Sequence, residues 1–187
     1  GKRFKSDILA FLITMLATIS LDLTQAILIG SLIAAGIFLN RIASLNVEVT
    51  DVDTQKLHLK GIMTQGKCNH IRVAYLTGPL FFAATGFFNE AVSDLGDTHA
   101  LILSMRGVPL VDTAGIEVIL RLNEKIQQRG GTLMFSGVHD NVLKMFKRAD
   151  LTDAIGMENL FWSSDQAIVA AEQRHCGFCG ENELPKN

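Results

Sequence analysis

A long apolar run near the start of the chain constrains the fold more than any other feature. Between Ile8 and Asn40 the only charged side chain is that of Asp22. This run of about 33 residues exceeds the roughly 20 that a membrane-spanning helix needs, and no ordinary globular core uses such a segment. Because the rest of the chain carries nearly all the charge, we expect a membrane segment followed by a domain in water.

A polar interruption at residues 20–25 indicates a helical hairpin with arms over 8–20 and 26–40. One straight helix would be roughly 50 Å long, against a hydrocarbon thickness of about 30 Å. It would also hold the Asp22 carboxylate near the middle of the membrane, where a charge is costly. We therefore place Asp22 in the turn at the outer surface. The alternatives are one long tilted anchor helix and, for Asp22, a position on an ion pathway.

Basic residues flank the run on both sides: Lys2, Arg3 and Lys5 precede it, and Arg41 follows it. Positive charge marks the cytoplasmic side, so both ends of the hairpin are expected there. Each arm is only roughly 20 Å long, which suits helices that are covered by other helices of a larger bundle. Together with a start at Gly1, this predicts that the chain is a piece of a longer protein.

The sequence after residue 44 alternates strand and helix patterns. Apolar runs predict strands over 71–76, 100–105 and 132–136, and helical periodicity predicts the intervening helices over 84–95, 112–129, 140–149 and 163–173. Residues 45–69 carry weaker strand signals, which would add an edge to the sheet. Strands that alternate with helices are typical of an α/β layer whose strands are parallel.

Composition and motifs exclude several classes of protein. The net charge of −2 shows no broad basic field, so we expect no nucleic-acid partner. The sequence lacks phosphate-binding glycine loops and catalytic triads, which argues against an enzyme and against a cofactor. Cys176 and Cys179 form a Cys-x-x-Cys pair without a matching second pair, so they are weak metal-ligand candidates. A redox pair and an incidental pair in a flexible tail are the alternatives.

Asp112, Thr113, Ala114 and Gly115 lie where a strand and a loop lead into a helix. The free backbone N–H groups at a helix N-terminus suit phosphate, a carboxylate or the acidic group of a partner. The alternative is a simple helix cap provided by Asp112 or Thr113. These four residues are the candidate interaction and regulatory loop.

The order of motifs resembles that of the STAS domain, which anti-sigma-factor antagonists share with the cytoplasmic tails of sulfate permease (SulP) anion transporters. The resemblance is carried by residues 112–115 and their helix, by Gly130-Gly131-Thr132-Leu133, by residues 78–84 and by residues 151–161. Upstream, residues 5–41 resemble the last two membrane helices of a SulP transporter. The resemblance implies a STAS-like β-sheet with packed helices, preceded by a transmembrane hairpin.

That resemblance predicts three parts: membrane helices over 1–44, a cytoplasmic STAS domain over 45–174 and a flexible tail over 175–187. It implies the C-terminal membrane and regulatory segment of a secondary transporter for sulfate or a related anion, in the inner membrane. The expected partners are membrane lipid, the remaining helices of the same transporter, a second copy in a homodimer and a cytoplasmic regulatory protein. A membrane-tethered STAS signalling module is the alternative.

One departure from the antagonist pattern concerns phosphorylation. In the antagonists the second residue after the aspartate is a serine that a kinase phosphorylates, and here that position is Ala114. We therefore expect docking at this loop without a phosphoswitch. Thr113 carries a hydroxyl, but it is displaced by one residue and is expected to help cap the helix.

Overall fold

The computed structural model describes residues 8, 11–13, 15–16, 23–42, 45–52, 57, 61, 68–93 and 96–177. Of these, residues 23, 39–42, 83 and 87 are described by their backbone alone. The chain divides into two compact units, residues 1–44 and residues 45–187. Each unit is described by itself.

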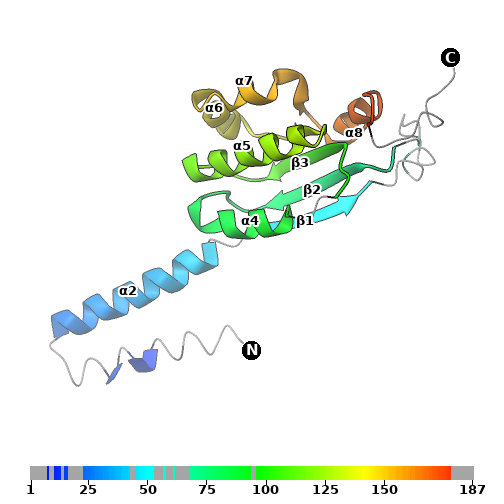
Figure 1. The fold of residues 1–187 in the computed structure, drawn as a ribbon. Helices are drawn as coiled ribbons and strands as arrows, with labels where there is room; N and C mark the ends of the chain where they lie inside the picture. Colours follow the sequence, from blue (N-terminus) through cyan, green and yellow to red (C-terminus); the bar gives the residue numbers. More distant parts are fainter. Residues whose placement is uncertain are drawn as a thin grey trace, which may run out of the picture. The chain divides into compact units, whose positions relative to one another are not determined.

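The described elements alternate strands and helices after residue 45 (Figure 1). In chain order they are α2 (Leu23–Ile42), β1 (Asn46–Asp51), β2 (Ile71–Thr77), the 3-10 turn η1 (Phe82–Ala84), α4 (Thr85–Ala91), β3 (Ala100–Gly107), α5 (Thr113–Gln128), β4 (Thr132–Ser136), α6 (Asp140–Arg148), α7 (Leu151–Ile155), the 3-10 turn η2 (Met157–Asn159), β5 (Leu160–Phe161) and α8 (Ser164–Glu172).

The strands form one five-stranded sheet in the order β1-β2-β3-β4-β5. Strand β1 lies at the edge and pairs antiparallel with β2, whereas β2 to β5 run parallel. Six successive residues of β3, Ala100 to Met105, are buried, because helices cover both faces of this central strand. The predicted α/β sheet with packed helices and an added edge is confirmed.

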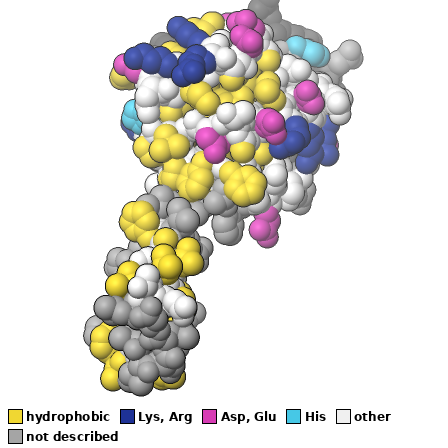
Figure 2. Space-filling model, turned by 90° about the vertical axis from the view of Figure 1, so that its left-hand side faces the viewer, with side chains coloured by type: hydrophobic (Ala, Val, Ile, Leu, Met, Phe, Trp, Pro, Cys, Tyr) yellow, Lys and Arg dark blue, Asp and Glu magenta, His cyan; other side chains and the backbone are white. Residues whose placement is uncertain are grey.

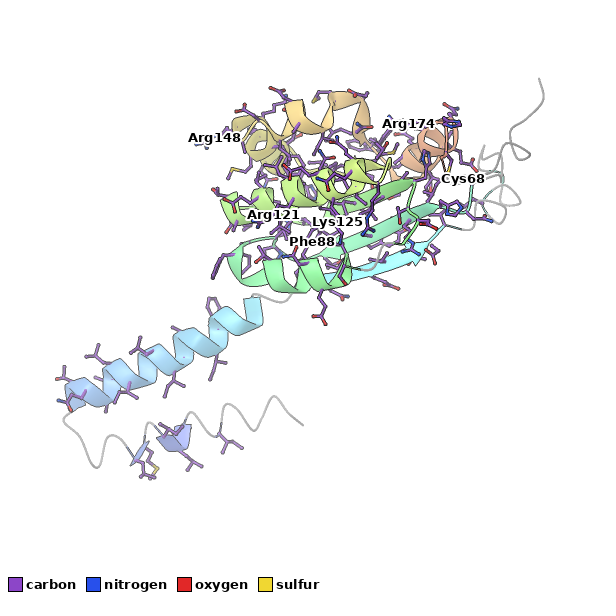
Figure 3. All side chains as sticks on the ribbon, viewed as in Figure 1. Cys68, Phe88, Arg121, Lys125, Arg148 and Arg174 are labelled. Carbon is purple, nitrogen blue, oxygen red and sulfur yellow. The ribbon has the colours of Figure 1, made fainter. Side chains whose placement is uncertain are left out.

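Two apolar clusters lie on opposite faces of the sheet. On the first face, Leu101 and Leu103 of β3 pack with residues of α4, α5, α6 and α7, including the fully buried Phe88, which is labelled in Figure 3. On the second face, Ile102 packs with residues of α8 such as Ile168. Alternation along β3 therefore sends successive side chains to different helical layers.

Several predicted element bounds agree closely with the structure. Strand β4 covers the predicted residues, β2 is one residue longer, and α8 begins one residue after its cap at Ser163. On α5, Ile116, Ile119 and Ile126 are buried as the periodicity predicts, while Glu117 and Arg121 approach to 3.8 Å on the exposed face.

Two predicted ends were wrong by more than one residue. Strand β3 continues to Gly107 instead of ending at Met105, because Thr77 pairs with Gly107 and extends the ladder. Helix α4 ends at Ala91, short of the predicted Leu95, where the Ser93 hydroxyl donates to a carbonyl of the last turn.

Asp140 precedes an apolar periodic stretch, and an aspartate at this place favours the N-cap of α6, but the structure has the cap one residue earlier. His139 is the N-cap, in an extended conformation, and Asp140 is the first helical residue. A carboxylate in the first turn still favours the helix, because it faces the positive end of the helix dipole.

The first unit contains α2 and helical residues at 8, 11–13 and 15–16. Helix α2 begins at Leu23, so Thr24 and Gln25 belong to its first turn and not to the predicted turn between arms. Polar side chains are tolerated there because the first backbone N–H groups have no partner within the helix. Asp22 lies outside the described residues. Within the described part of the chain, no helix has both the length and the apolar character needed to cross a membrane.

Candidate functional site

Asp112 begins α5 as its N-cap. Its backbone is extended, and its Oδ1 accepts a hydrogen bond of 2.8 Å from the backbone N–H of Gly115. Asp112 therefore caps α5, as the simple-cap alternative for this loop predicted. The expectation that Thr113 helps to cap the helix was wrong, because Thr113 is the first helical residue and its side chain is exposed.

The second carboxylate oxygen of Asp112 ties the loop to a segment thirty residues earlier. Oδ2 accepts a 3.0 Å hydrogen bond from the backbone N–H of Phe82, and the Asp112 N–H donates to the Leu80 carbonyl at 3.2 Å. The two segments therefore form one rigid corner at the carboxyl ends of β2 and β3. Since Asp112 itself supplies a negative group to the N-terminus of α5, this position is poorly suited to an external anion.

Gly115 lets the two segments of this corner approach each other. A Cβ at this position would lie 2.5 Å from the Leu80 carbonyl oxygen and 2.9 Å from Cγ1 of Val111. Such distances are too short for a carbon atom. The glycine is therefore required by the close packing of α5 against the segment that follows β2.

Apolar side chains surround the corner on its solvent side. Phe82 is 78% exposed and Leu110 is 49% exposed, whereas Ala114 is half-buried. Figure 2 shows hydrophobic side chains gathered on this side of the domain, with Lys and Arg side chains grouped near its upper edge. The corner therefore offers apolar contact area beside a fixed backbone.

The sequence did not reveal a cleft that lies on the other face of the sheet, over the carboxyl ends of β2, β3 and β4. Its cavity of about 420 Å³ is lined by residues that include Ser104, Arg106, Ser136 and Trp162, and a second cavity of about 520 Å³ shares Arg106 and Trp162. These residues come from separate strands and from the segment before α8. The run Trp162-Ser163-Ser164 was the sequence feature that could have indicated this cleft, because it brings an aromatic ring and two hydroxyl groups to the start of a helix.

His99, the residue before β3, is a buried titratable group. Its Nε2 lies 3.2 Å from the Ala171 carbonyl of α8, and its Nδ1 has no hydrogen-bond partner among the described residues. Burial lowers the pKa of the His99 imidazole, the Ala171 hydrogen bond opposes this, and the charges of Arg174, His175 and His70 lower it further. The neutral imidazole therefore connects β3 to the end of α8.

The Cys-x-x-Cys pair is only partly within the described residues. Cys176 is buried in the apolar cluster beneath α8, which also contains Cys68, and Cys179 lies outside the described part. Over the residues that the structure describes, no group of three or more His, Cys, Asp or Glu side chains is placed to hold a metal ion.

The sheet order, the Asp112 corner and the helices of the first face define the class of the protein, and comparison with known families agrees. The family model described as "STAS domain" matches residues 62–167, which is more than half of the chain. The chain therefore belongs to the STAS domain family, as its motifs predicted.

Its curated relatives are transporters. Over 107 residues the chain is 30% identical to "Solute carrier family 26 member 10" of Mus musculus, covering 51% of this chain and 16% of the relative. Over 108 residues it is 29% identical to "Low affinity sulfate transporter 3" of Stylosanthes hamata, covering 50% and 17%. The chain thus corresponds to less than a fifth of each of these relatives.

Solved structures show the same fold. The murine Slc26a9 anion transporter in its inward-facing state matches with a TM-score of 0.71 and 19% identity, over 91% of this chain and 29% of that one. The STAS domain of a SulP transporter from Vibrio cholerae matches with a TM-score of 0.52 and 25% identity, over 64% and 94%. An anti-sigma factor antagonist from Mycobacterium paratuberculosis matches with a TM-score of 0.54 and 14% identity, over 69% and 95%.

Proposed function

We propose that this chain is the C-terminal membrane and regulatory segment of a secondary transporter for sulfate or a related inorganic or organic anion. The observation that carries the proposal is the succession of an apolar segment and a STAS domain whose relatives are named as sulfate and solute-carrier transporters. Residues 45–187 make up about three quarters of the chain. The 91% match to Slc26a9 therefore includes residues from the first unit.

We propose that residues 8–40 form a membrane hairpin with both ends in the cytoplasm, at the inner membrane. On α2 the large apolar side chains Ile27, Leu28, Leu32 and Phe38 are between 58% and 72% exposed. Apolar side chains of this size need a cover of lipid or of other helices. Helices that do not cross a bilayer alone are covered in this way within a transporter bundle.

In such a transporter the STAS domain would support assembly of a homodimer and regulation by cytoplasmic proteins. The substrate site would lie near the midplane of the membrane, among helices outside this chain. We therefore expect residues 1–187 alone to move no anion. A STAS domain that serves assembly and regulation needs no catalytic residues, which agrees with the lack of enzyme motifs in the sequence.

An uptake measurement tests the transport proposal. The natural full-length protein, in proteoliposomes, should take up radiolabelled sulfate or exchange it for chloride, bicarbonate or a dicarboxylate. A deletion of the region from Leu45 onward should lower the yield of assembled dimer and the uptake together. If the full-length protein incorporates with the correct orientation and moves none of these anions, the transport proposal is wrong.

The alternative is a membrane-tethered STAS module whose output is protein binding. It is supported by the shared fold of the anti-sigma factor antagonist. Protein binding without anion uptake by the full-length protein would favour this alternative, and uptake would exclude it.

Under either reading we propose that the Asp112 corner docks a regulatory protein and is not a phosphorylation switch. Docking is supported by the exposed Phe82 and Leu110, which lie beside a backbone that Asp112 fixes. The absence of a switch is supported by Ala114, which has no hydroxyl to phosphorylate. Partner capture should be lost with Phe82→Ser and kept with Met157→Ser, which removes another exposed apolar side chain outside the corner. Stoichiometric phosphate on Thr113 that controls partner release would contradict the proposal.

A further inference from the structure

The cleft on the α8 face of the sheet is separate from the Asp112 corner. The corner belongs to the side on which α5 packs, whereas the cleft belongs to the side covered by α8. Arg106, near the end of β3, lines both cavities of the cleft, together with Gly137 and Trp162. We propose that this cleft binds a small planar aromatic anion, such as an aryl phosphate or an aryl carboxylate.

Ser104 and Ser136 lie at the base of the cleft, with Tyr75 beside them. Register places Tyr75, Ser104 and Ser136 side by side across β2, β3 and β4. The residues two positions earlier on these strands, Val73, Ile102 and Met134, all belong to the apolar cluster under α8. Because side chains alternate along a strand, the three hydroxyl-bearing residues face the same side and replace apolar packing where α8 begins.

Ser104 presents a hydroxyl to the cavity. The residue is 9% exposed and lines the cavity, and its hydroxyl is not one of the enclosed polar atoms without a partner, which among the described residues are His99 Nδ1 and Asn159 Oδ1. The neighbouring Ser136 is 1% exposed and is satisfied by the Ser164 hydroxyl at 2.8 Å. The Ser104 hydroxyl is therefore open to the cavity, where a polar atom of a ligand would replace water as its partner.

Arg106 is the cationic group that an anion in the cleft would meet. Arg106 forms no ion pair within the described part of the chain, and its backbone carbonyl accepts a 2.8 Å hydrogen bond from Nε2 of His139, which holds the strand end in place. The N-terminus of the nine-residue α8 also faces the cavity through Ser164 and Asp165. The Asp165 carboxylate is exposed at the rim, and Asp140 lines the second cavity, so Arg106 has to outweigh these two carboxylates locally.

Aromatic side chains make the rim suitable for a flat ring. Trp162 is 83% exposed and Tyr75 is 46% exposed, and both line the cavity. Exposed aromatic rings beside a guanidinium offer stacking surfaces for a planar group whose acid points towards Arg106. The volume of about 420 Å³ is within the usual range of sites for small organic molecules.

The cleft contains its own reporter, because Trp162 is the one tryptophan of the 187 residues. The test is a titration of the full chain, purified in a non-ionic detergent, followed by Trp162 fluorescence and by calorimetry. Phenyl phosphate is the probe, inorganic phosphate supplies the anion alone, and benzyl alcohol supplies the ring alone. Phenyl phosphate should change the emission saturably and bind at least about tenfold more tightly than either fragment.

Matched variants separate the cleft from the rest of the surface. Arg106→Gln should weaken phenyl phosphate binding by about tenfold or more, since a hydrogen bond to a charged group is lost, and Ser104→Ala should weaken it by about threefold or more. Arg121→Gln, which removes an exposed arginine from α5, should leave the binding unchanged. Absence of saturable binding at millimolar phenyl phosphate, equal binding of inorganic phosphate, or equal losses with Arg106→Gln and Arg121→Gln would each overturn the proposal.

Discussion

Gly115→Ala should destabilise the STAS domain although alanine is the better helix former. By helix propensity alone, alanine in place of glycine stabilises a helix by about 0.8–1 kcal/mol. At Gly115, however, the new Cβ would lie 2.5 Å from the Leu80 carbonyl oxygen, 2.9 Å from Cγ1 of Val111 and 3.1 Å from Cγ of Leu80. The Leu80 carbonyl cannot move freely, because it accepts the 3.2 Å hydrogen bond from Asp112.

The magnitude follows from these contacts. Overpacking of this kind costs about 1–3 kcal/mol, and displacement of Leu80 weakens a hydrogen bond worth about 1 kcal/mol. After the gain in propensity, the net loss is about 1–3 kcal/mol. For a domain of this size each kcal/mol corresponds to about 3 °C, so the midpoint should fall by about 3–9 °C.

Differential scanning calorimetry of the purified chain measures this shift, and α4 provides the control. Gly86 is also helical, but a Cβ there would meet nothing within 4 Å. Gly86→Ala should therefore raise the midpoint by about 2–3 °C through propensity alone. If Gly115→Ala raises the midpoint as much as Gly86→Ala does, the described packing of α5 against Leu80 is wrong.

Three further predictions follow from the second unit. Asp112→Ala should cost about 2 kcal/mol in chemical unfolding, because it removes the α5 cap and the acceptor for the Phe82 N–H, and Asp112→Asn, which keeps one acceptor oxygen, should cost less. The His99 pKa is lower in the folded than in the unfolded chain, so stability should be complete above about pH 6.5 and decline as the pH falls towards the folded-state pKa. His99→Gln should flatten this decline in urea titrations, and an unchanged slope would contradict the assignment. Residues 45–187 expressed alone should unfold in one cooperative thermal transition, because two apolar clusters lie within this unit; a chain without such a transition would show that the unit needs the membrane segment.

Hydrophobic periodicity predicted those elements of the domain whose burial can be read from neighbouring residues alone. The strand over Thr132–Ser136 and the buried run from Ala100 to Met105 were identified because short, continuous apolar runs are typical of strands buried on both faces. Strand β5 was not predicted, since the two residues Leu160 and Phe161 are too few to show a period. Its pairing with β4 depends on residues distant in sequence.

The two sites differ in how much of them the sequence could reveal. Asp112 was identifiable as a cap from its place before an amphipathic helix. Its second role, as acceptor for Phe82, depends on a contact thirty residues away that no local pattern encodes. The cleft was missed for the same reason, because Ser104, Arg106 and Trp162 come together only when parallel strand ends and the start of α8 are placed side by side.

The central claim is that a membrane hairpin attaches the STAS domain to a transporter. The side of the membrane on which each end and the turn of the hairpin lie tests this claim most directly. Single cysteines at Lys5, Asp22 and Arg41, in a full-length protein whose native cysteines, the three of this chain included, have been replaced, can be labelled with a membrane-impermeant maleimide on intact and permeabilised cells. We predict that Asp22→Cys is labelled on intact cells and that Lys5→Cys and Arg41→Cys are labelled only after permeabilisation. Labelling of Asp22→Cys from the cytoplasm only, or of Lys5→Cys and Arg41→Cys from opposite sides, would contradict the hairpin.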